Sequence, residues 1–156
     1  MNIRHLKGQD CQSILPVMNE WWGGREMTYL LPRFLFDNFQ DTSYVVERDG
    51  NITGFLIGFL SQTDKDEAYI HLVGVHPDNR REGIGSTLYE NFFNEVSHYG
   101  VKRVRCITNP VNKNSINYHT KAGFRMVEGD KWIDDIPVHK NYDGKGNDRV
   151  LFIKNL

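Results

Sequence analysis

One stretch of the chain, HPDNRREGIGSTLYENF, places two arginines and two glycines where an apolar run passes into a helical pattern. A helix amino terminus leaves its first amides unpaired and carries the positive end of the helix dipole, so it attracts anions. Gly83 and Gly85 lack the side chains that would keep a phosphate from those amides. Arg80 and Arg81 add positive charge, and Ser86 can donate a hydrogen bond. The pattern indicates either a phosphate-binding turn or an ordinary glycine-rich turn.

Two other phosphate-binding patterns do not fit this stretch. The Walker loop ends in Gly-Lys-Ser or Gly-Lys-Thr, which is absent here. The dinucleotide fingerprint needs a glycine earlier than Gly83 and an acidic residue that closes a second strand, and this chain does not match that pattern. A phosphate site at this turn would therefore have to be of another type.

The elements around the turn follow from hydrophobic periodicity and turn residues. Strands are expected at 2–6, on both sides of Asp49-Gly50, at 68–75, 101–108 and 124–128 and in the final DRVLFIK, and helices at 10–22, 29–39, 83–98 and 112–122. Pro16 should kink the first helix or delay its start. This order predicts an α/β or α+β fold with a partly antiparallel sheet. The length of 156 residues suits a single domain over residues 1–156.

Composition narrows the class of protein. The net charge of -1 and the pI near 6.6 provide no basic field for nucleic acid. Cys11 and Cys106 form no CxxC or metal-like cluster, so they are expected to be small buried hydrophobes in a reducing compartment and no metal is expected. With no signal peptide pattern and no membrane span, a cytoplasmic location is predicted.

The turn resembles motif A of the GCN5-related N-acetyltransferase (GNAT) superfamily, Arg/Gln-x-x-Gly-x-Gly/Ala, which follows a strand often ending in Val-x-Pro. The chain has Val75-His76-Pro77, and then Arg80, Gly83 and Gly85 in that register. Two ordered motifs are less likely to coincide by chance than one, so a second match matters.

That second match is NKNSINYHTKAGF, which resembles motif B of the same superfamily, Asn-x-x-Ala/Ser followed by a Tyr or His four residues before Gly-Phe. Asn112, Ser115, His119, Gly123 and Phe124 fall on those places. The order of predicted elements also matches the family, so the resemblance covers about residues 2–155.

The resemblance implies a mixed, largely antiparallel sheet of about seven strands flanked by about four helices. It also implies that acetyl-coenzyme A lies between strands four and five, which splay apart. The residues assigned to the cofactor in this way are Val73 and Val75 for pantetheine, Arg80, Arg81, Glu82, Gly83, Ile84, Gly85 and Ser86 for the pyrophosphate, and Asn112 and Ser115 of motif B.

Acetyl transfer needs an unprotonated amine, a base or water chain to take its proton, and an acid for the departing thiolate. The family usually places a tyrosine acid four residues before the motif B glycine, where this chain has His119. We expect His119 to be the acid and Tyr118 to be core, with the reverse assignment as the alternative. Glu67, Tyr69 and His71 share one face of their strand, and His71 is the expected base, unless it is only a hydrogen-bonded sheet residue.

In this family the acceptor pocket is usually shaped by the loop between the first two helices and by the loop joining the last two strands. Trp21 and Trp22 could line it, unless they pack in the core. The acids that could attract an ammonium group are Glu20, Glu26, Asp134 and Asp135.

The resulting prediction is an acetyl-coenzyme A dependent N-acetyltransferase that acts on a primary amine of a small molecule by direct attack on the thioester. A protein lysine or amino terminus is the alternative acceptor. A non-catalytic module that binds coenzyme A as a sensor is the alternative from another class. A homodimer is also considered, because an edge strand at the C-terminus could pair with its copy.

Overall fold

The computed structural model describes residues Met1 to Leu156, which form two compact units. Unit 1 comprises Met1–Leu60 and Ile70–Tyr99, and unit 2 comprises Ser61–Tyr69 and Gly100–Leu156. Strand β4 (Glu67–Val75) belongs to both, because its first residues lie in unit 2 and the rest in unit 1. The single-domain organisation stays a prediction.

Seven strands form one hydrogen-bonded sheet in the order β1-β2-β3-β4-β5-β9-β6, and β7 and β8 form a separate pair. The other strands are β1 (Asn2–His5), β2 (Tyr44–Arg48), β3 (Asn51–Leu60), β5 (Arg103–Thr108), β6 (Arg125–Met126), β7 (Lys131–Ile133), β8 (Ile136–Val138) and β9 (Val150–Asn155). The α-helices are α1 (Cys11–Trp21), α2 (Arg33–Asn38), α3 (Ile84–His98) and α4 (Lys113–Lys121). Short 3-10 turns are η1 (Gly8–Asp10), η2 (Thr28–Leu30), η3 (Gln40–Thr42) and η4 (Pro77–Asn79).

The pairing confirms the predicted mixed, largely antiparallel sheet. β1 with β2, β2 with β3, β5 with β9 and β6 with β9 are antiparallel, and β4 with β5 is parallel. The parallel register joins Glu67 to Arg103 and Tyr69 to Arg105. None of the helices is both long enough and apolar enough to span a bilayer.

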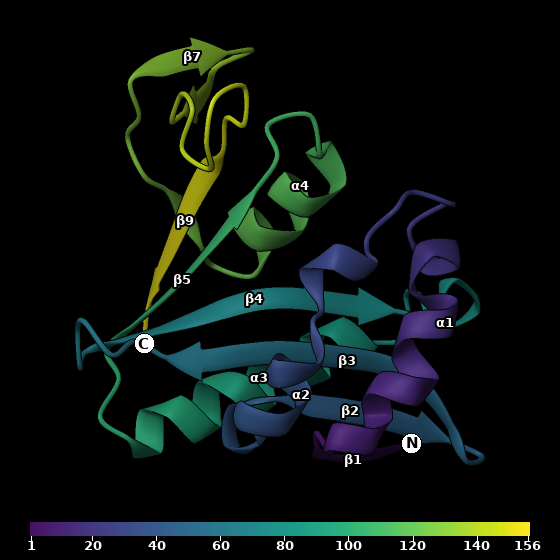
Figure 1. The fold of residues 1–156 in the computed structure, drawn as a ribbon. Coiled ribbons are helices and arrows are strands. Elements are labelled where there is room, and N and C mark those ends of the chain that lie inside the picture. The colour runs from purple at the N-terminus through teal and green to yellow at the C-terminus, as the bar shows by residue number, and fades with distance from the viewer. The chain divides into compact units, whose positions relative to one another are not determined.

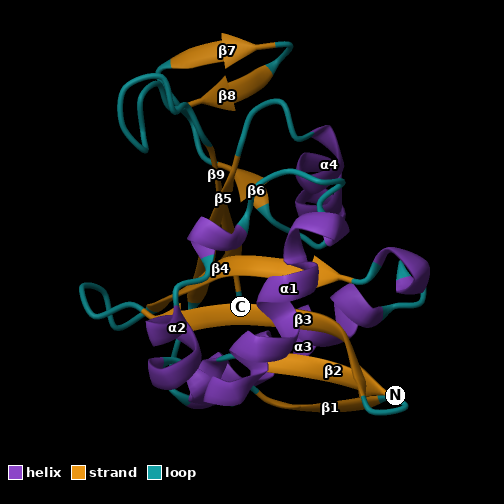
Figure 2. Cartoon of the chain, turned by 45° about the vertical axis from the view of Figure 1, so that its right-hand side comes forward, coloured by secondary structure: helices purple, strands orange, loops and turns teal.

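In unit 1, helices cover both faces of the part of the sheet formed by β1, β2 and β3. α1 and α2 lie on one face and α3 lies on the other (Figures 1 and 2). Residues alternate between the two faces of a strand. Phe55 and Ile57 of β3 therefore join the core under α1 and α2. Gly54 faces α3, and a Cβ there would lie 2.6 Å from the Ile84 side chain.

The hairpin between β2 and β3 matches the sequence prediction. Asp49 and Gly50 have φ of 53° and 80° and connect Arg48 directly to Asn51. Two successive positive φ angles are typical of the tight turns that suit the twist of a hairpin.

Of the two expected helices that contain a proline, only the second is altered by it. The first helix begins at Cys11 and runs through Pro16, so that residue does not delay its start. The expected helix over 29–39 is divided into η2 and α2, since Pro32 is extended with ψ of 151° and Leu31 before it is also non-helical. Proline disfavours helix in the residue that precedes it.

Unit 2 contains the first residues of β4, together with β5, β9, β6, α4 and a hairpin in a region predicted to be a loop (Figure 2). Asp134 and Asp135 form the turn of that hairpin, with φ of 49° and 64°, between β7 and β8. The last strand, β9, pairs with β5 on one side and β6 on the other. The expectation of a C-terminal edge strand is therefore wrong, because the short β6 covers that side of β9.

Candidate functional site

The turn before α3 combines left-handed backbone conformations with amides that have no protein partner. Arg81 has φ of 68° and Gly83, the N-cap of α3, has φ of 81°. A Cβ on Gly83 would meet no atom within 4 Å, so glycine is favoured there by the backbone conformation rather than by lack of room. The first intrahelical bond runs from the Thr87 amide to the Gly83 carbonyl at 3.0 Å. The amides of residues 81–86 donate to no other protein group, as expected at a helix start.

The two arginines of the same turn have different environments. Arg80 donates through Nη2 to the Trp21 carbonyl at 2.6 Å and through Nε to the Val75 carbonyl at 3.3 Å. Arg81 is exposed and makes no ion pair or hydrogen bond through its side chain. The predicted pyrophosphate arginines thus differ, since only Arg80 is engaged by the protein.

Glu82 brings a negative charge into this turn, and that charge is compensated. Its carboxylate accepts from Asn79 Nδ2 at 3.1 Å and from Arg48 Nη1 at 3.0 Å. The Asn79 hydrogen bond, followed by the nearby Arg48 guanidinium, lowers the pKa of Glu82. The carboxylate therefore holds the turn to the β2–β3 hairpin through Arg48.

The last part of β4 leads into the turn. Val73 and Val75, predicted to pair with pantetheine, are half-buried, and Gly74 between them is buried. A Cβ on Gly74 would lie 2.6 Å from both the Phe55 and Trp22 rings. The glycine therefore permits the close approach of these rings to the strand backbone.

The two tryptophans have different environments. Trp21 is only 4% exposed, with its ring 6.0 Å from that of Phe55 and 5.4 Å from that of His76. The Trp21 ring is therefore packed largely in the core, and the expectation that Trp21 lines an acceptor pocket stays a prediction. Trp22 packs on Phe55 and stays half-exposed.

Glu26 lies exposed in the loop after α1, where local hydrogen bonds orient it. Its carboxylate accepts from the Thr28 amide and hydroxyl and from Asn19 Nδ2. The Thr28 hydroxyl, followed by the Thr28 amide, lowers the pKa of Glu26. The side chain is therefore an ionised acceptor at neutral pH.

His71, the expected base, is hydrogen-bonded to the main chain through one of its two ring nitrogens. Its Nε2 lies 2.6 Å from the Leu30 carbonyl, which can only accept, so Nε2 carries the proton and Nδ1 can accept one. Glu67 is paired with Arg103 and Arg105, each through Nε at 3.0 Å. Burial raises the pKa of Tyr69.

In unit 2, the predicted motif B residues shape the start of α4. Asn112 is the N-cap, and its side-chain oxygen accepts from the Ser115 amide at 3.2 Å. Both residues are half-buried. Ser115 is the third residue after the N-cap, the position whose amide an N-cap side chain ordinarily binds.

His119 lies on the inner face of α4 with Ile116, three residues earlier. It is 8% exposed, and its ring stacks on Phe152 at 5.0 Å. Nδ1 donates to the Ser115 carbonyl at 2.7 Å. Burial lowers the pKa of His119, and the Ser115 bond opposes only part of this effect. The imidazole is therefore neutral at pH 7, with a proton held on Nδ1.

Tyr118 is 36% exposed, so the expectation that it is a core residue is wrong. The physical reason is the helical step of about 100° between neighbours, which turns Tyr118 away when His119 faces inward. Cys106 is buried, and burial raises the pKa of its thiol, which confirms it as a core residue.

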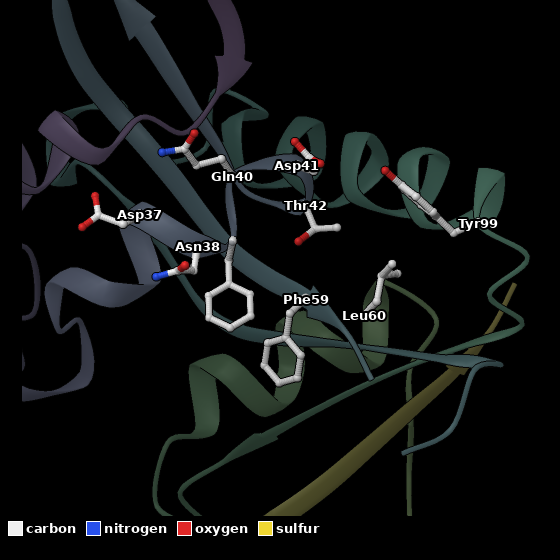
Figure 3. Close-up of a pocket in the computed structure, with 9 residues that line it drawn as sticks. Asp37, Asn38, Gln40, Asp41, Thr42, Phe59, Leu60 and Tyr99 are labelled. Carbon is white, nitrogen blue, oxygen red and sulfur yellow. The ribbon is translucent and has the colours of Figure 1, made fainter. Parts of the chain in front are cut away.

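Two hollows lie within unit 1. One of about 440 Å³ is lined by Asp37, Asn38, Phe39, Gln40, Asp41, Thr42, Phe59, Leu60 and Tyr99 (Figure 3). It contains none of the residues predicted for the site. The other, of about 630 Å³, includes Trp21, His76 and Asn79 beside the β2–β3 hairpin.

The predicted residues thus gather in two groups. Unit 1 holds the α3 turn, Val73, Val75, His71, the two tryptophans and Glu26, and unit 2 holds the α4 residues. Sequence reasoning missed the partners of Arg80 and Glu82. No local signal could have found them, because Arg80 and Trp21 are 59 positions apart and Arg48 and Glu82 are 34 apart.

The chain is similar to known acetyltransferases. The model of the Acetyltransferase (GNAT) family matches residues 10–124. An L-2,4-diaminobutyric acid acetyltransferase of Nocardia farcinica (strain IFM 10152) is 33% identical over 79 residues, which cover 51% of this chain and 41% of that protein. The chain therefore spans less than half the length of this curated relative.

Solved structures share the fold over nearly the whole chain. Ard1 from Thermoplasma volcanium has a TM-score of 0.79 at 22% identity, covering 99% of this chain and 97% of that one. Diaminobutyrate acetyltransferase EctA from Paenibacillus lautus, solved with L-2,4-diaminobutyric acid and coenzyme A, has a TM-score of 0.74 at 20% identity, covering 99% and 93%.

Proposed function

Because the chain belongs to the acetyltransferase (GNAT) family, we propose that it is an acetyl-coenzyme A dependent N-acetyltransferase acting on a primary amine of a small molecule. The observation that carries the proposal is the row of unpaired amides at residues 81–86, at the positive end of α3. The diaminobutyrate acetyltransferases of Nocardia and Paenibacillus support a small amine as the acceptor.

The chain's own groups fit a coenzyme A diphosphate at this turn. The amides of residues 81–86 would bind its oxygens, with Arg81 as the free cation beside them. The main chain of Val73 and Val75 would pair with the pantetheine arm, and Asn112 with Ser115 would serve by fixing the start of α4. When bound, acetyl-coenzyme A supplies an acetyl group activated as a thioester.

The acceptor must reach the thioester as a neutral amine, and holding it in place supplies much of the rate. We assign proton removal to His71 through Nδ1, since Nε2 is held by the Leu30 carbonyl. Glu26 and Trp22, both on the loop after α1, are assigned to the acceptor, with Glu26 attracting its positive charge. Direct attack of the amine on the thioester needs no covalent enzyme intermediate.

We assign the acid to Tyr118 rather than to His119. A neutral His119 whose proton is held on Nδ1 by the Ser115 carbonyl is poorly suited to donate, whereas Tyr118 is exposed and carries a hydroxyl proton. His119 would instead hold α4 by its stacking on Phe152.

The test of this proposal is thiol release from acetyl-coenzyme A with a panel of diamines, amino acids and peptides bearing free amino termini. Turnover with small diamines is expected, and turnover only with peptides would favour the protein acceptor. Tight coenzyme A binding without turnover on any amine would favour the sensor module.

The acid is tested by two neighbouring variants. Tyr118→Phe should lower kcat about 100-fold, within the range for loss of a general acid, whereas His119→Phe should retain most of it. The measurement is kcat at saturating amine and acetyl-coenzyme A. Loss of kcat in His119→Phe with an unchanged Tyr118→Phe would reassign the acid to His119.

A further inference from the structure

Arg80 joins two segments that are 59 positions apart in the sequence. Its Nη2 donates to the carbonyl of Trp21, the last residue of α1, at 2.6 Å. Its Nε donates to the carbonyl of Val75, the last residue of β4, at 3.3 Å. One guanidinium therefore bridges the carboxyl end of a helix and the end of a strand.

The Trp21 carbonyl is a site where a cation is stabilising. The last carbonyls of a helix have no intrahelical partner, and the negative end of the helix dipole lies there. No basic residue occupies the last turn of α1. Arg80 supplies from elsewhere in the chain the cation and the hydrogen bond that α1 lacks.

Other contacts fix the same junction. The Trp21 ring lies edge-on to His76 at 5.4 Å, immediately after β4. The His76 amide donates to the Thr53 carbonyl at 2.8 Å, and His76 Nδ1 accepts from the Asp78 amide at 3.1 Å. The beginning of the α3 turn is therefore anchored to the end of α1 and to β3.

The end of α1 also fixes the position of the loop that is proposed to bind the acceptor. Asn19, in the last turn of α1, accepts from the Met27 amide at 2.7 Å and donates to Glu26 at 3.3 Å. Any displacement of the α1 end would move Asn19 and with it Glu26. Arg80 is thus connected to Glu26 through α1, by its own hydrogen bond to the Trp21 carbonyl and by that of Asn19 to Glu26.

We propose that Arg80 is a positioning residue that clamps the α1–α2 loop to the turn before α3, instead of a ligand of the pyrophosphate. The inference rests on the proposed function, because the two clamped segments are the acceptor loop and the phosphate turn of that proposal. Arg81, the neighbouring arginine with no side-chain partner, is left as the charge available to the phosphates.

The experiment compares Arg80→Met, Arg80→Lys and Arg81→Met, with Arg33→Gln on the surface of α2 as the control for loss of an arginine. Three quantities are measured: KM for the amine, Kd for coenzyme A by calorimetry, and amide hydrogen exchange of residues 22–28. Lysine keeps the charge of Arg80 but cannot reproduce the two-pronged contact with two carbonyls.

Arg80→Met and Arg80→Lys should both raise KM for the amine about tenfold, the scale of one lost charged hydrogen bond, with coenzyme A Kd changed less than about threefold. Exchange of residues 22–28 should accelerate in both. Arg81→Met should weaken coenzyme A instead and leave that exchange unchanged, and Arg33→Gln should alter none of the three.

Weaker coenzyme A binding in Arg80→Met that Arg80→Lys restores would overturn the proposal and make Arg80 a phosphate ligand. Unchanged exchange in both Arg80 variants would also overturn it. Should the wild-type protein turn over no amine, the proposed function fails, but the exchange measurement still decides whether Arg80 clamps the loop.

Discussion

Neighbouring residues on α4 illustrate how environment, and not residue type alone, assigns chemistry. Histidine ordinarily titrates near neutral pH, which made His119 attractive as an acid. In the structure its ring is stacked on Phe152 and its Nδ1 proton is held by a main-chain carbonyl. Burial therefore favours the neutral form of His119, which is why the proposed function assigns the acid to Tyr118.

The buried imidazole predicts how stability depends on pH. Because the folded-state pKa of His119 is below its ordinary value of 6.5, the unfolded state binds more protons between those two values. The free energy of unfolding should therefore fall as the pH is lowered through about 6.5 and towards the folded-state pKa. His119→Phe, which keeps an aromatic ring against Phe152, should remove this part of the slope.

Urea unfolding at a series of pH values between about 5 and 8 measures this linkage. His98→Gln, at the exposed end of α3, is the matched control and should keep the wild-type slope. An identical pH dependence in wild type and His119→Phe would show that His119 is not responsible.

At the scale of elements, α3 and α4 begin with different kinds of N-cap. Gly83 begins α3 with a left-handed backbone and no side-chain cap, so the amides beyond it remain available. Asn112 begins α4 with a side-chain cap that occupies the Ser115 amide. The first arrangement suits an anion, and the second suits a helix that has only to be held in place.

The cap of α4 predicts a measurable loss of stability. Asn112→Ala should lower the free energy of unfolding by about 1 kcal/mol, the usual cost of a lost N-cap. Asn112→Ser should retain most of it, because serine also caps well. Asn114→Ala, two residues into the same helix and exposed, is the control and should cost nothing. Equal denaturation midpoints for Asn112→Ala and Asn114→Ala would contradict a capping role.

At the scale of the whole molecule, the proposed cofactor should be linked to folding. A ligand that binds only the folded state, present at about 100 times its Kd, stabilises the protein by about 2.7 kcal/mol. Coenzyme A should therefore raise Tm by several degrees, whereas pantetheine, which lacks the diphosphate, should raise it much less.

Gly83→Val tests whether the α3 turn is responsible for that stabilisation. Valine is strained at φ of 81°, so the turn should change shape and the coenzyme A shift should be lost. Gly100→Val is closely matched, since Gly100 has φ of 84° and an equally open surrounding, yet lies outside the proposed site. It should lower Tm by itself but keep the shift. A full shift in Gly83→Val would remove the turn from the proposal.

The turns, the strand faces and the helix starts of this chain could be predicted from the sequence, because each depends on residues that are close together along the chain. Asp49-Gly50 specified a tight turn, and alternation along β4 specified which residues share a face. The glycines and arginines of the α3 turn indicated an anion site because a helix start has the same unpaired amides in every protein. Pro32 divided a predicted helix through a rule that is also local.

Only the tertiary structure decided what the side chains of those elements contact. Nothing near Arg80 in the sequence indicates that its guanidinium serves the end of α1, and nothing near Trp21 indicates that its ring lies between Phe55 and His76. The cover of β9 by β6, and the inward position of His119 beside an exposed Tyr118, also depend on packing. Burial and long-range hydrogen bonds arise when distant segments meet, so they are absent from any short stretch of sequence.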